Sequence, residues 1–184
     1  MAGERGDVAA HDQDAGCEVA VTIALMLIAV ITVSDRCSQG LMIDTAGPAV
    51  AALVGRQWPR AEVVTDLVPD DEDVIVGKLE RLSEQGAALI LTVGGTGLGP
   101  RDLTPEATRR VIDREAPGLA EAMRSLGAAK NPLAWLSRGV TGLQGKTLIV
   151  NLPGSKRGAE ESLTAILPLL AHGIEIAGGG QSHP

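Results

Sequence analysis

The sequence predicts an α/β fold in which helices cover a largely parallel sheet, because strand-like and helix-like segments alternate along it. Short, β-branched apolar runs are separated by longer stretches whose apolar residues recur every three or four positions. Glycine-containing turns directly follow two of these runs. The chain has 184 residues, with no internal repeat and no convincing linker, so we expect a single domain.

Each element is expected from its own local pattern. Strands are expected at 26–33, 61–68, 87–93 and 146–152, and the first, third and fourth are apolar enough to be buried on both faces. Helices are expected at 46–56, 70–85, 104–115, 119–126 and 158–172. Gly86 is expected to end the second helix, and Pro168 is expected to break the last one. Residues 130–145 are rich in turn formers and are expected to be irregular.

Composition excludes several classes of partner. A net charge of −7 argues against nucleic acid, which normally needs a basic stripe on the protein. The chain has no Phe and no Tyr, so a ring-shaped ligand must be held by backbone, polar and aliphatic groups. Its two cysteines form no CxxC motif, which gives no support to a zinc site or a disulfide framework and fits a cytoplasmic protein.

The apolar run at 19–33 needs a separate check for membrane insertion. It is shorter than the roughly 20 residues of a spanning helix, and threonines interrupt it. Its upstream flank is acidic, whereas a secretory signal begins with cations. We therefore expect neither a membrane span nor a signal peptide.

The stretch 91–106, LTVGGTGLGPRDLTPE, carries the strongest functional signal. An apolar run stops at four closely spaced glycines (94, 95, 97 and 99), which allow a tight bend or the close approach of a ligand. Thr104 then suits a helix N-cap, and a helix N-terminus after a glycine turn favours anions. Arg101 and Asp102 add a cation and a carboxylate at the rim. We therefore expect a phosphate-bearing ligand here.

Two standard phosphate motifs do not fit this stretch. Gly94 and Gly99 match the first six positions of a P-loop, but Pro100 and Arg101 stand where Lys and Ser or Thr are required. The Rossmann fingerprint fails because its third glycine would fall at Pro100. A tight turn without a ligand is the alternative interpretation of the glycines.

A second strand end has similar features. Asn151-Leu152-Pro153-Gly154-Ser155 closes the strand expected at 146–152, and Lys156 and Arg157 follow it. Ser155 offers a hydroxyl or an N-cap, while the two cations are alternatively a solvated surface pair. Ligands of open α/β sheets bind at the carboxyl ends of strands, so both turns are expected to face one crevice.

Two further sets of polar residues are ambiguous. Ser34 and Asp35 follow the first strand directly, and they could bind a ligand or cap a turn. Asp70 lies in an acidic cluster at 66–73, where it is a natural N-cap and its neighbours suit the helix dipole. From the residues alone the structural interpretation of this cluster is favoured over a functional one. The sequence shows no arrangement of a nucleophile with a base.

Taken together, these motifs resemble the Mog/MoaB family of molybdenum cofactor biosynthesis. The resemblance covers roughly residues 27–172 and combines several motifs in order. They are Val33-Ser34-Asp35-Arg36, Pro69-Asp70, Thr92-Val93-Gly94-Gly95-Thr96-Gly97, Arg101-Asp102-Leu103-Thr104-Pro105-Glu106, Pro117-Gly118, Leu136-Ser137-Arg138-Gly139 and Asn151-Leu152-Pro153-Gly154-Ser155. The combination is highly specific.

The resemblance implies a three-layer α/β/α fold, usually trimeric, that binds molybdopterin. In the Mog-type branch such a protein transfers adenylate from MgATP to the terminal phosphate of molybdopterin, giving adenylyl-molybdopterin and pyrophosphate. Contact with the molybdate-inserting enzyme of the pathway is a further expected partnership. The alternative is a MoaB-type protein that binds molybdopterin, or acts as a scaffold, without catalysis.

The resemblance also assigns roles to residues. Asp70 and Asp102 match carboxylates around the magnesium–nucleotide and pterin sites, so we expect both to be catalytic and to bind Mg²⁺. Arg101 or Lys156 is expected to balance charge. The residues expected to bind the pterin and its phosphate are Ser34, Asp35, Gly94, Gly95, Thr96, Gly97, Arg101, Ser137, Pro153, Gly154 and Ser155.

One part of the chain departs from the family pattern. Residues 1–25 exceed what the core needs, so we expect a partly disordered extension there, a molybdopterin-binding domain at 26–176 and a tail at 177–184. An upstream start codon is an alternative origin for the extension, because Met26 opens the matching region. A third interpretation of the whole chain is an unrelated phosphosugar or nucleotide binder that uses the same turn physics.

Overall fold

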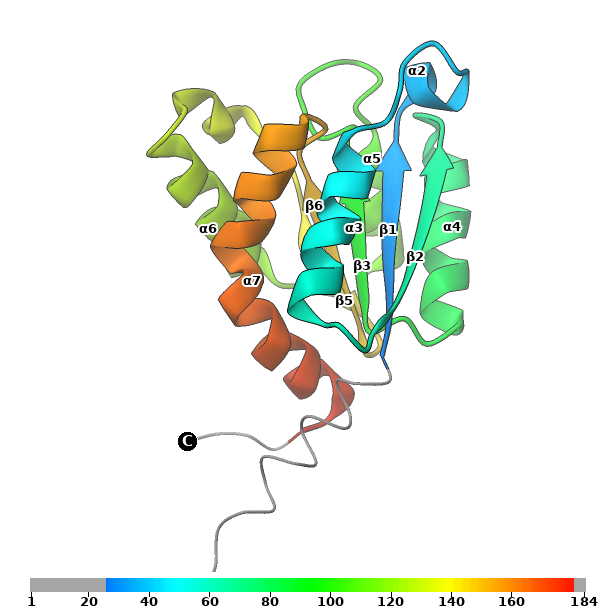
Figure 1. The fold of residues 1–184 in the computed structure, drawn as a ribbon. Helices are drawn as coiled ribbons and strands as arrows, with labels where there is room; N and C mark the ends of the chain where they lie inside the picture. Colours follow the sequence, from blue (N-terminus) through cyan, green and yellow to red (C-terminus); the bar gives the residue numbers. More distant parts are fainter. Residues whose placement is uncertain (1–25, 181–184) are drawn as a thin grey trace, which may run out of the picture.

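The computed structural model describes residues 26–180. The expected extension at 1–25 and the last part of the expected tail, 181–184, lie outside the described residues. The described chain forms one six-stranded sheet in the order β2-β1-β3-β6-β5-β4, with helices on both faces (Figure 1). The three-layer α/β/α architecture expected from the sequence is therefore confirmed.

The sheet is parallel at its centre and antiparallel at one edge. Its strands are β1 (Leu27–Val33), β2 (Glu62–Val68), β3 (Leu89–Val93), β4 (Arg114–Glu115), β5 (Thr141–Gln144) and β6 (Thr147–Leu152). Strand β1 pairs in parallel with β2 and β3, and β3 pairs in parallel with β6. Strands β5 and β4 continue the sheet in antiparallel pairings. Neither of these two short strands was expected.

The helices form two layers. They are α2 (Asp35–Ser38), α3 (Ala46–Gln57), α4 (Glu72–Glu84), α5 (Thr104–Val111), α6 (Pro117–Ala128) and α7 (Lys156–Gly178), together with the 3-10 helix η1 (Pro132–Leu136). Helices α3, α6 and α7 cover one face of the sheet, and α4 and α5 cover the other (Figure 1). In the described part of the chain, no helix is both long enough and apolar enough to span a membrane.

Alternating side chains of the central strands build two separate cores. Ile28 and Val30 of β1 pack in the core beneath α3, α6 and α7, whereas Ala29 and Ile31 pack in the core beneath α4 and α5. Because successive strand residues point to opposite faces, a strand buried on both sides is apolar at most positions, and its few polar side chains are hydrogen-bonded. The mainly apolar sequences of β1, β3 and β6 thus have a direct structural cause, and the more polar β2 lies at an edge.

Three local expectations are corrected. Pro168 lies inside α7, which is continuous from Lys156 to Gly178. Proline inside a helix costs about 3 kcal/mol, but the buried stripe of α7 continues from Leu163 and Ile166 to Leu170 and Ile174 across it. Because this stripe packs on the same core before and after Pro168, tertiary packing outweighs the local cost.

The other two corrections concern helix starts. Asp71, not Asp70, caps α4, since its carboxylate accepts a hydrogen bond from the Val74 N–H at 3.1 Å. Thr104 is the first residue of α5 instead of its N-cap, and its hydroxyl donates to the carbonyl oxygen of Gly94 at 2.9 Å. The side chains of Asp70 and Thr104, which were expected to cap helices, instead form hydrogen bonds with Asp35 and Gly94. The expected stop at Gly86 is confirmed by its left-handed φ of +82°.

Candidate active site

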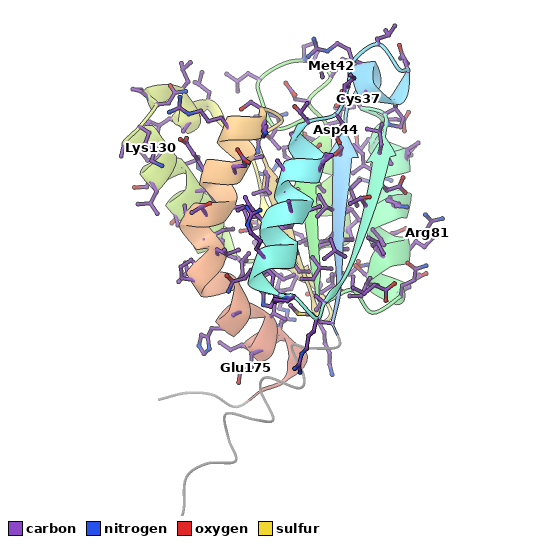
Figure 2. The ribbon with its side chains drawn as sticks, in the orientation of Figure 1. Cys37, Met42, Asp44, Arg81, Lys130 and Glu175 are labelled. Atoms are coloured by element: carbon purple, nitrogen blue, oxygen red, sulfur yellow. The ribbon has the colours of Figure 1, made fainter. Side chains whose placement is uncertain are left out.

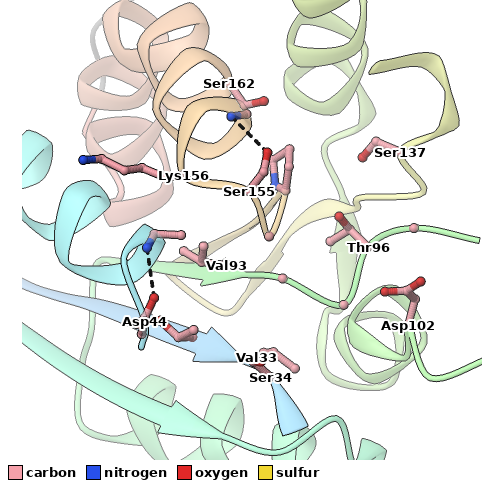
Figure 3. A pocket seen from close by; sticks show the side chains of 18 of the residues that line it. Val33, Ser34, Asp44, Val93, Thr96, Asp102, Ser137, Ser155, Lys156 and Ser162 are labelled. Carbon is pink, nitrogen blue, oxygen red and sulfur yellow. Dashed lines mark hydrogen bonds between the residues drawn. The ribbon is translucent and has the colours of Figure 1, made fainter. Parts of the chain in front are cut away.

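A cavity of about 900 Å³ opens at the carboxyl ends of β1, β3 and β6. The chain passes from β1 to β2 on one side and then returns to β3 on the other, so this end of the sheet is a topological switch point. The loops after the three strands line the cavity together with 42–46 and parts of 131–137 (Figure 3). Asp44 and Met42 lie at this end of the molecule, away from Arg81 and Glu175 (Figure 2).

The two glycine turns meet at the floor of the cavity. Gly94 has a left-handed φ of +113°, and a Cβ atom there would lie 2.3 Å from the carbonyl oxygen of Val33. A Cβ atom at Gly154 would lie 3.1 Å from the Cα of Gly94. The expectation that both turns face one crevice is confirmed, and the glycines are needed because three strand ends converge there.

The loop after β3 presents free backbone donors. Gly95, Thr96 and Gly97 line the cavity. Within residues 26–180, the N–H groups of Gly95, Thr96, Gly97 and Leu98 donate to no other protein atom. Successive unpaired N–H groups in a turn form a concave anion site without needing a cationic side chain. This loop therefore has the backbone geometry that a phosphate group requires.

Asp102 lies against this loop and lines the same cavity. Its Oδ2 accepts a hydrogen bond from the Gly99 N–H at 2.7 Å, which folds the glycine segment around the carboxylate. A Cβ atom at Gly97 or Gly99 would lie 3.0 or 2.8 Å from Asp102 Oδ2. The Asp102 carboxylate can therefore occupy this position only because residues 97 and 99 are glycines.

Asp35 and Asp70 hold each other through reciprocal hydrogen bonds. The Asp35 N–H donates to Asp70 Oδ2 at 2.7 Å, and the Asp70 N–H donates to Asp35 Oδ1 at 3.0 Å. Arg101 reaches from the glycine loop to Asp35 Oδ2, with its Nη2 at 2.6 Å. This guanidinium is the main reason that the pKa of Asp35 is lowered, with burial acting in the opposite direction.

Arg101 is accordingly turned away from the role of a ligand. It lies outside the set of residues that line the cavity, while Lys156, at the start of α7, lies within it. Arg101 therefore joins the loop after β3 to the loop after β1. Lys156 is the better placed of the two cations to balance the charge of a bound phosphate.

The remaining residues that were expected at the site all line the cavity, and two of them also cap helices. Ser34 and Ser155 both line the cavity and both cap helices, since their hydroxyl oxygens each accept an N–H hydrogen bond at 3.2 Å, from Cys37 and Gly158. The capping alternative for Ser34 is thus the one that the hydrogen bonds support. Ser137 and Pro153 also line the cavity.

Burial is the main cause that raises the pKa of Asp70, and the negative charges of Asp35 and Asp102 act in the same direction. The Asp35 N–H partly offsets this by stabilising the ionised form. A carboxyl that is costly to ionise in the folded chain lowers the stability of the fold as it loses its proton. Ionised Asp70 therefore lowers the stability of the fold.

We predict that Asp70→Asn raises the melting temperature at neutral pH. The amide oxygen still accepts the Asp35 N–H, but no charge has to be buried. As pH rises, the unfolded chain ionises at its lower pKa first, so wild-type stability falls between that value and the raised folded pKa. Thermal melts from about pH 4 to pH 7 should show the advantage of the variant growing with pH. An advantage that shrinks with pH would contradict this.

Three residues important for the site have roles that the sequence did not reveal. The buried Asn151 amide donates to the hydroxyls of Thr92 and Thr108, both at 2.9 Å, and its oxygen accepts the Val140 N–H. This network ties β6 to β3 and α5 just below the cavity. Asp44 lines the cavity and accepts hydrogen bonds from Thr32 and from the first residues of α3. The third residue, Arg138, contacts the glycine loop from outside the cavity.

Fold and site together define a class: an α/β protein with free loop N–H groups and carboxylates around a cavity at a topological switch point. Comparison with known proteins then identifies the family. The family described as "Probable molybdopterin binding domain" matches residues 29–172, which is most of the chain. The chain belongs to this family, as its motifs predicted.

Individual relatives agree with this assignment. The molybdopterin adenylyltransferase of Haemophilus influenzae is 41% identical over 150 residues, covering 78% of this chain and 74% of that protein. The molybdenum cofactor synthesis protein cinnamon of Drosophila melanogaster is 39% identical over 150 residues, but this chain spans only 25% of its length. The crystal structure of the molybdopterin biosynthesis enzyme MoaB from Thermus thermophilus is 48% identical, with a TM-score of 0.78, covering 84% of this chain and 97% of that one.

Proposed function

We propose that this protein is a molybdopterin adenylyltransferase, which transfers adenylate from MgATP to the terminal phosphate of molybdopterin. The observation that carries the proposal is the cavity in which free loop N–H groups and the carboxylates of Asp70 and Asp102 meet. The relative from Haemophilus influenzae, which carries this name, supports the reaction type.

The reaction requires no nucleophile from the protein. An oxygen of the molybdopterin phosphate attacks the α-phosphorus of ATP and forms a new P–O–P linkage. The bond between the α-phosphorus and its bridging oxygen breaks, and pyrophosphate leaves with the bonding electrons. The protein has to align the two substrates and stabilise the charge that develops on the phosphoryl oxygens. Backbone N–H groups of Gly95–Gly97 suit the second task.

Magnesium fits the residues that line the cavity. The cavity is lined by five carboxylates and two cationic side chains, namely Asp35, Asp44, Asp70, Asp102, Glu161, Arg36 and Lys156. A polyanionic nucleotide would be repelled by this excess of negative charge unless a cation accompanied it. Asp70 and the free oxygen of Asp102 would hold Mg²⁺, which prefers a few carboxylates together with phosphate and water oxygens. When bound, the ion would supply electrostatic stabilisation of the phosphoryl oxygens.

The second glycine turn suits the phosphate of molybdopterin. Gly154 and Ser155 line the cavity directly before α7, whose first residue is Lys156. The N-terminus of this long helix and the Lys156 ammonium both favour a negative group. With the nucleotide near Asp70 and Asp102, the two phosphates would approach each other across the contact between Gly94 and Gly154.

An adenylation assay tests this proposal. The purified protein is incubated with MgATP and molybdopterin, and products are separated by liquid chromatography and identified by mass spectrometry. We expect adenylyl-molybdopterin and pyrophosphate in equal amounts, and no product when either substrate is left out. Tight binding of molybdopterin without any ATP-dependent product would contradict the proposal.

That contrary outcome defines the second candidate function, a non-catalytic molybdopterin-binding or scaffold protein of the MoaB type. The observation in its favour is the identity of 48% to the Thermus thermophilus protein named MoaB. The two functions share the cavity and differ in whether the carboxylates serve a nucleotide.

We also propose that the protein is a cytoplasmic homotrimer. Exposed apolar side chains outside the cavity offer surfaces for contact between copies, among them Leu41 and Trp135. Light scattering after size exclusion should give about three times the chain mass of 18.9 kDa, and a monomer would contradict this. A pull-down with the molybdate-inserting enzyme would test the expected partnership.

A further inference from the structure

Arg138 makes hydrogen bonds to three carbonyl groups of the loop after β3, although it lies outside the residues that line the cavity. Its backbone N–H donates to the Thr96 oxygen at 2.9 Å. Its side-chain Nε donates to the carbonyl oxygen of Gly97 at 2.6 Å, and its Nη2 donates to the backbone carbonyl oxygen of Asp102. One residue thus contacts both ends of the glycine segment from behind.

These contacts determine which way the peptide groups of the loop face. In a trans peptide, the carbonyl of one residue and the N–H of the next point in opposite directions. With the carbonyls of Thr96 and Gly97 turned to Arg138, the N–H groups of Gly97 and Leu98 must point away from it. They are among the N–H groups that have no acceptor within the described residues. Arg138 therefore orients two of the four free N–H groups of the loop from outside the cavity.

The charge of Arg138 is already matched by another residue. Its Nη1 forms an ion pair with Glu106 in the first turn of α5. Burial of Glu106 tends to raise its pKa, but the hydrogen bond from Arg138 is among the interactions that overcome this and lower it. A guanidinium that is neutralised in this way attracts a phosphate less strongly. Its planar group instead donates hydrogen bonds to several acceptors at once, among them the carbonyls of the loop.

We propose that Arg138 is a positioning residue, whose backbone N–H and guanidinium hold the carbonyls of Thr96, Gly97 and Asp102 so that the N–H groups of Gly97 and Leu98 remain available to a bound phosphate. The proposal rests on the proposed function only in taking that phosphate from ATP or molybdopterin. The cradle itself is independent of whether adenylyl transfer takes place, so binding can be tested separately from catalysis.

The test measures binding of inorganic pyrophosphate, in the presence of Mg²⁺, to the wild type and to Arg138→Lys and Arg138→Ala. Lysine keeps the charge and the backbone N–H, but it has no planar fork that can bind the Gly97 and Asp102 carbonyls and the Glu106 carboxylate at once. We expect both variants to bind about tenfold or more weakly by calorimetry. The amide ¹⁵N–¹H signals of Gly95–Leu98 should shift in the free variants, which a loss of overall stability alone would not cause.

Chemical rescue distinguishes geometry from charge. Methylguanidinium, at concentrations far below those that unfold proteins, should restore pyrophosphate binding to Arg138→Ala, whereas methylammonium should not. Arg110→Ala is the matched control, since Arg110 pairs with Glu72 and Asp73 on the surface and does not contact the loop. Its pyrophosphate affinity should equal that of the wild type. If Arg138→Ala does not fold, the lysine variant still provides the test.

Wild-type affinity and unshifted loop amides in Arg138→Lys would overturn the proposal, as would equal rescue by the two cations. The proposed function can fail independently of it. A wild type that binds pyrophosphate but forms no adenylyl-molybdopterin would contradict adenylyl transfer and leave the role of Arg138 intact. A fully active Arg138→Lys enzyme would contradict the role of Arg138 alone.

Discussion

Asp102→Asn is expected to lower the turnover of adenylyl transfer by about 10²- to 10³-fold, because it removes one of the two carboxylates that would hold Mg²⁺ beside the phosphoryl oxygens. The structure makes asparagine the informative replacement. Its amide oxygen can still accept the Gly99 N–H that Asp102 Oδ2 now accepts at 2.7 Å, so the loop keeps its shape. Alanine would remove both the charge and this bond, and its larger loss of activity would mix two causes.

A matched control exists on a different turn. Asp113 Oδ2 accepts the Gly145 N–H at 2.7 Å, which reproduces the contact between Asp102 and Gly99 outside the set of residues that line the cavity. Asp113→Asn should leave kcat unchanged. Steady-state kinetics of both variants, with circular dichroism to verify folding, make the comparison. Near-normal kcat in a folded Asp102→Asn protein would show that the carboxylate is not catalytic.

Gly94→Ala is expected to destabilise the fold by about 3 kcal/mol or more, or to prevent folding altogether. The reason is twofold. The φ of +113° disfavours any residue with a Cβ, and that Cβ would lie 2.3 Å from the rigid backbone oxygen of Val33. Relief requires the ends of β1 and β3 to separate, which would also open the contact with Gly154. A soluble variant should therefore lose phosphate binding as well.

Gly86→Ala separates the two causes. Gly86 also has a left-handed φ, +82°, but a Cβ there would meet no atom within 4 Å. Its replacement should cost only the conformational term of about 1–2 kcal/mol. Urea denaturation of both variants gives the difference in free energy of unfolding. Equal losses at the two positions would show that the close approach to Val33 does not matter.

The fold was predictable because its evidence is local. The mainly apolar strands and the stop signal at Gly86 each follow from neighbouring residues, and the structure confirms them. The short strands β4 and β5 were missed, because Arg114–Glu115 and Thr141–Gln144 gain their extended form from pairing with each other and with β6. Pro168 misled for a similar reason, since the packing that holds α7 together comes from distant elements.

In the candidate site, too, local features were predictable and contacts between distant residues were not. Glycines mark a turn from sequence alone, so the cradle at Gly94–Gly97 was predictable. The partner of Arg101 was not, because Asp35 lies 66 positions away in the chain and meets it only when β1 and β3 pair. Arg138 belongs to the motif Leu136-Ser137-Arg138-Gly139, but no local spacing predicts its hydrogen bond to Gly97, which is 41 positions away. Long-range hydrogen bonds of this kind can be read only from the folded chain.

The reciprocal bonds between Asp35 and Asp70, together with the Arg101 bridge, have a consequence for binding kinetics. They join the loops that follow β1, β2 and β3 into one cross-linked rim. Loops that are already ordered lose little conformational entropy when a ligand arrives. A nucleotide should therefore associate in a single kinetic step whose observed rate rises linearly with concentration. The saturation that marks a slow lid closure should be absent.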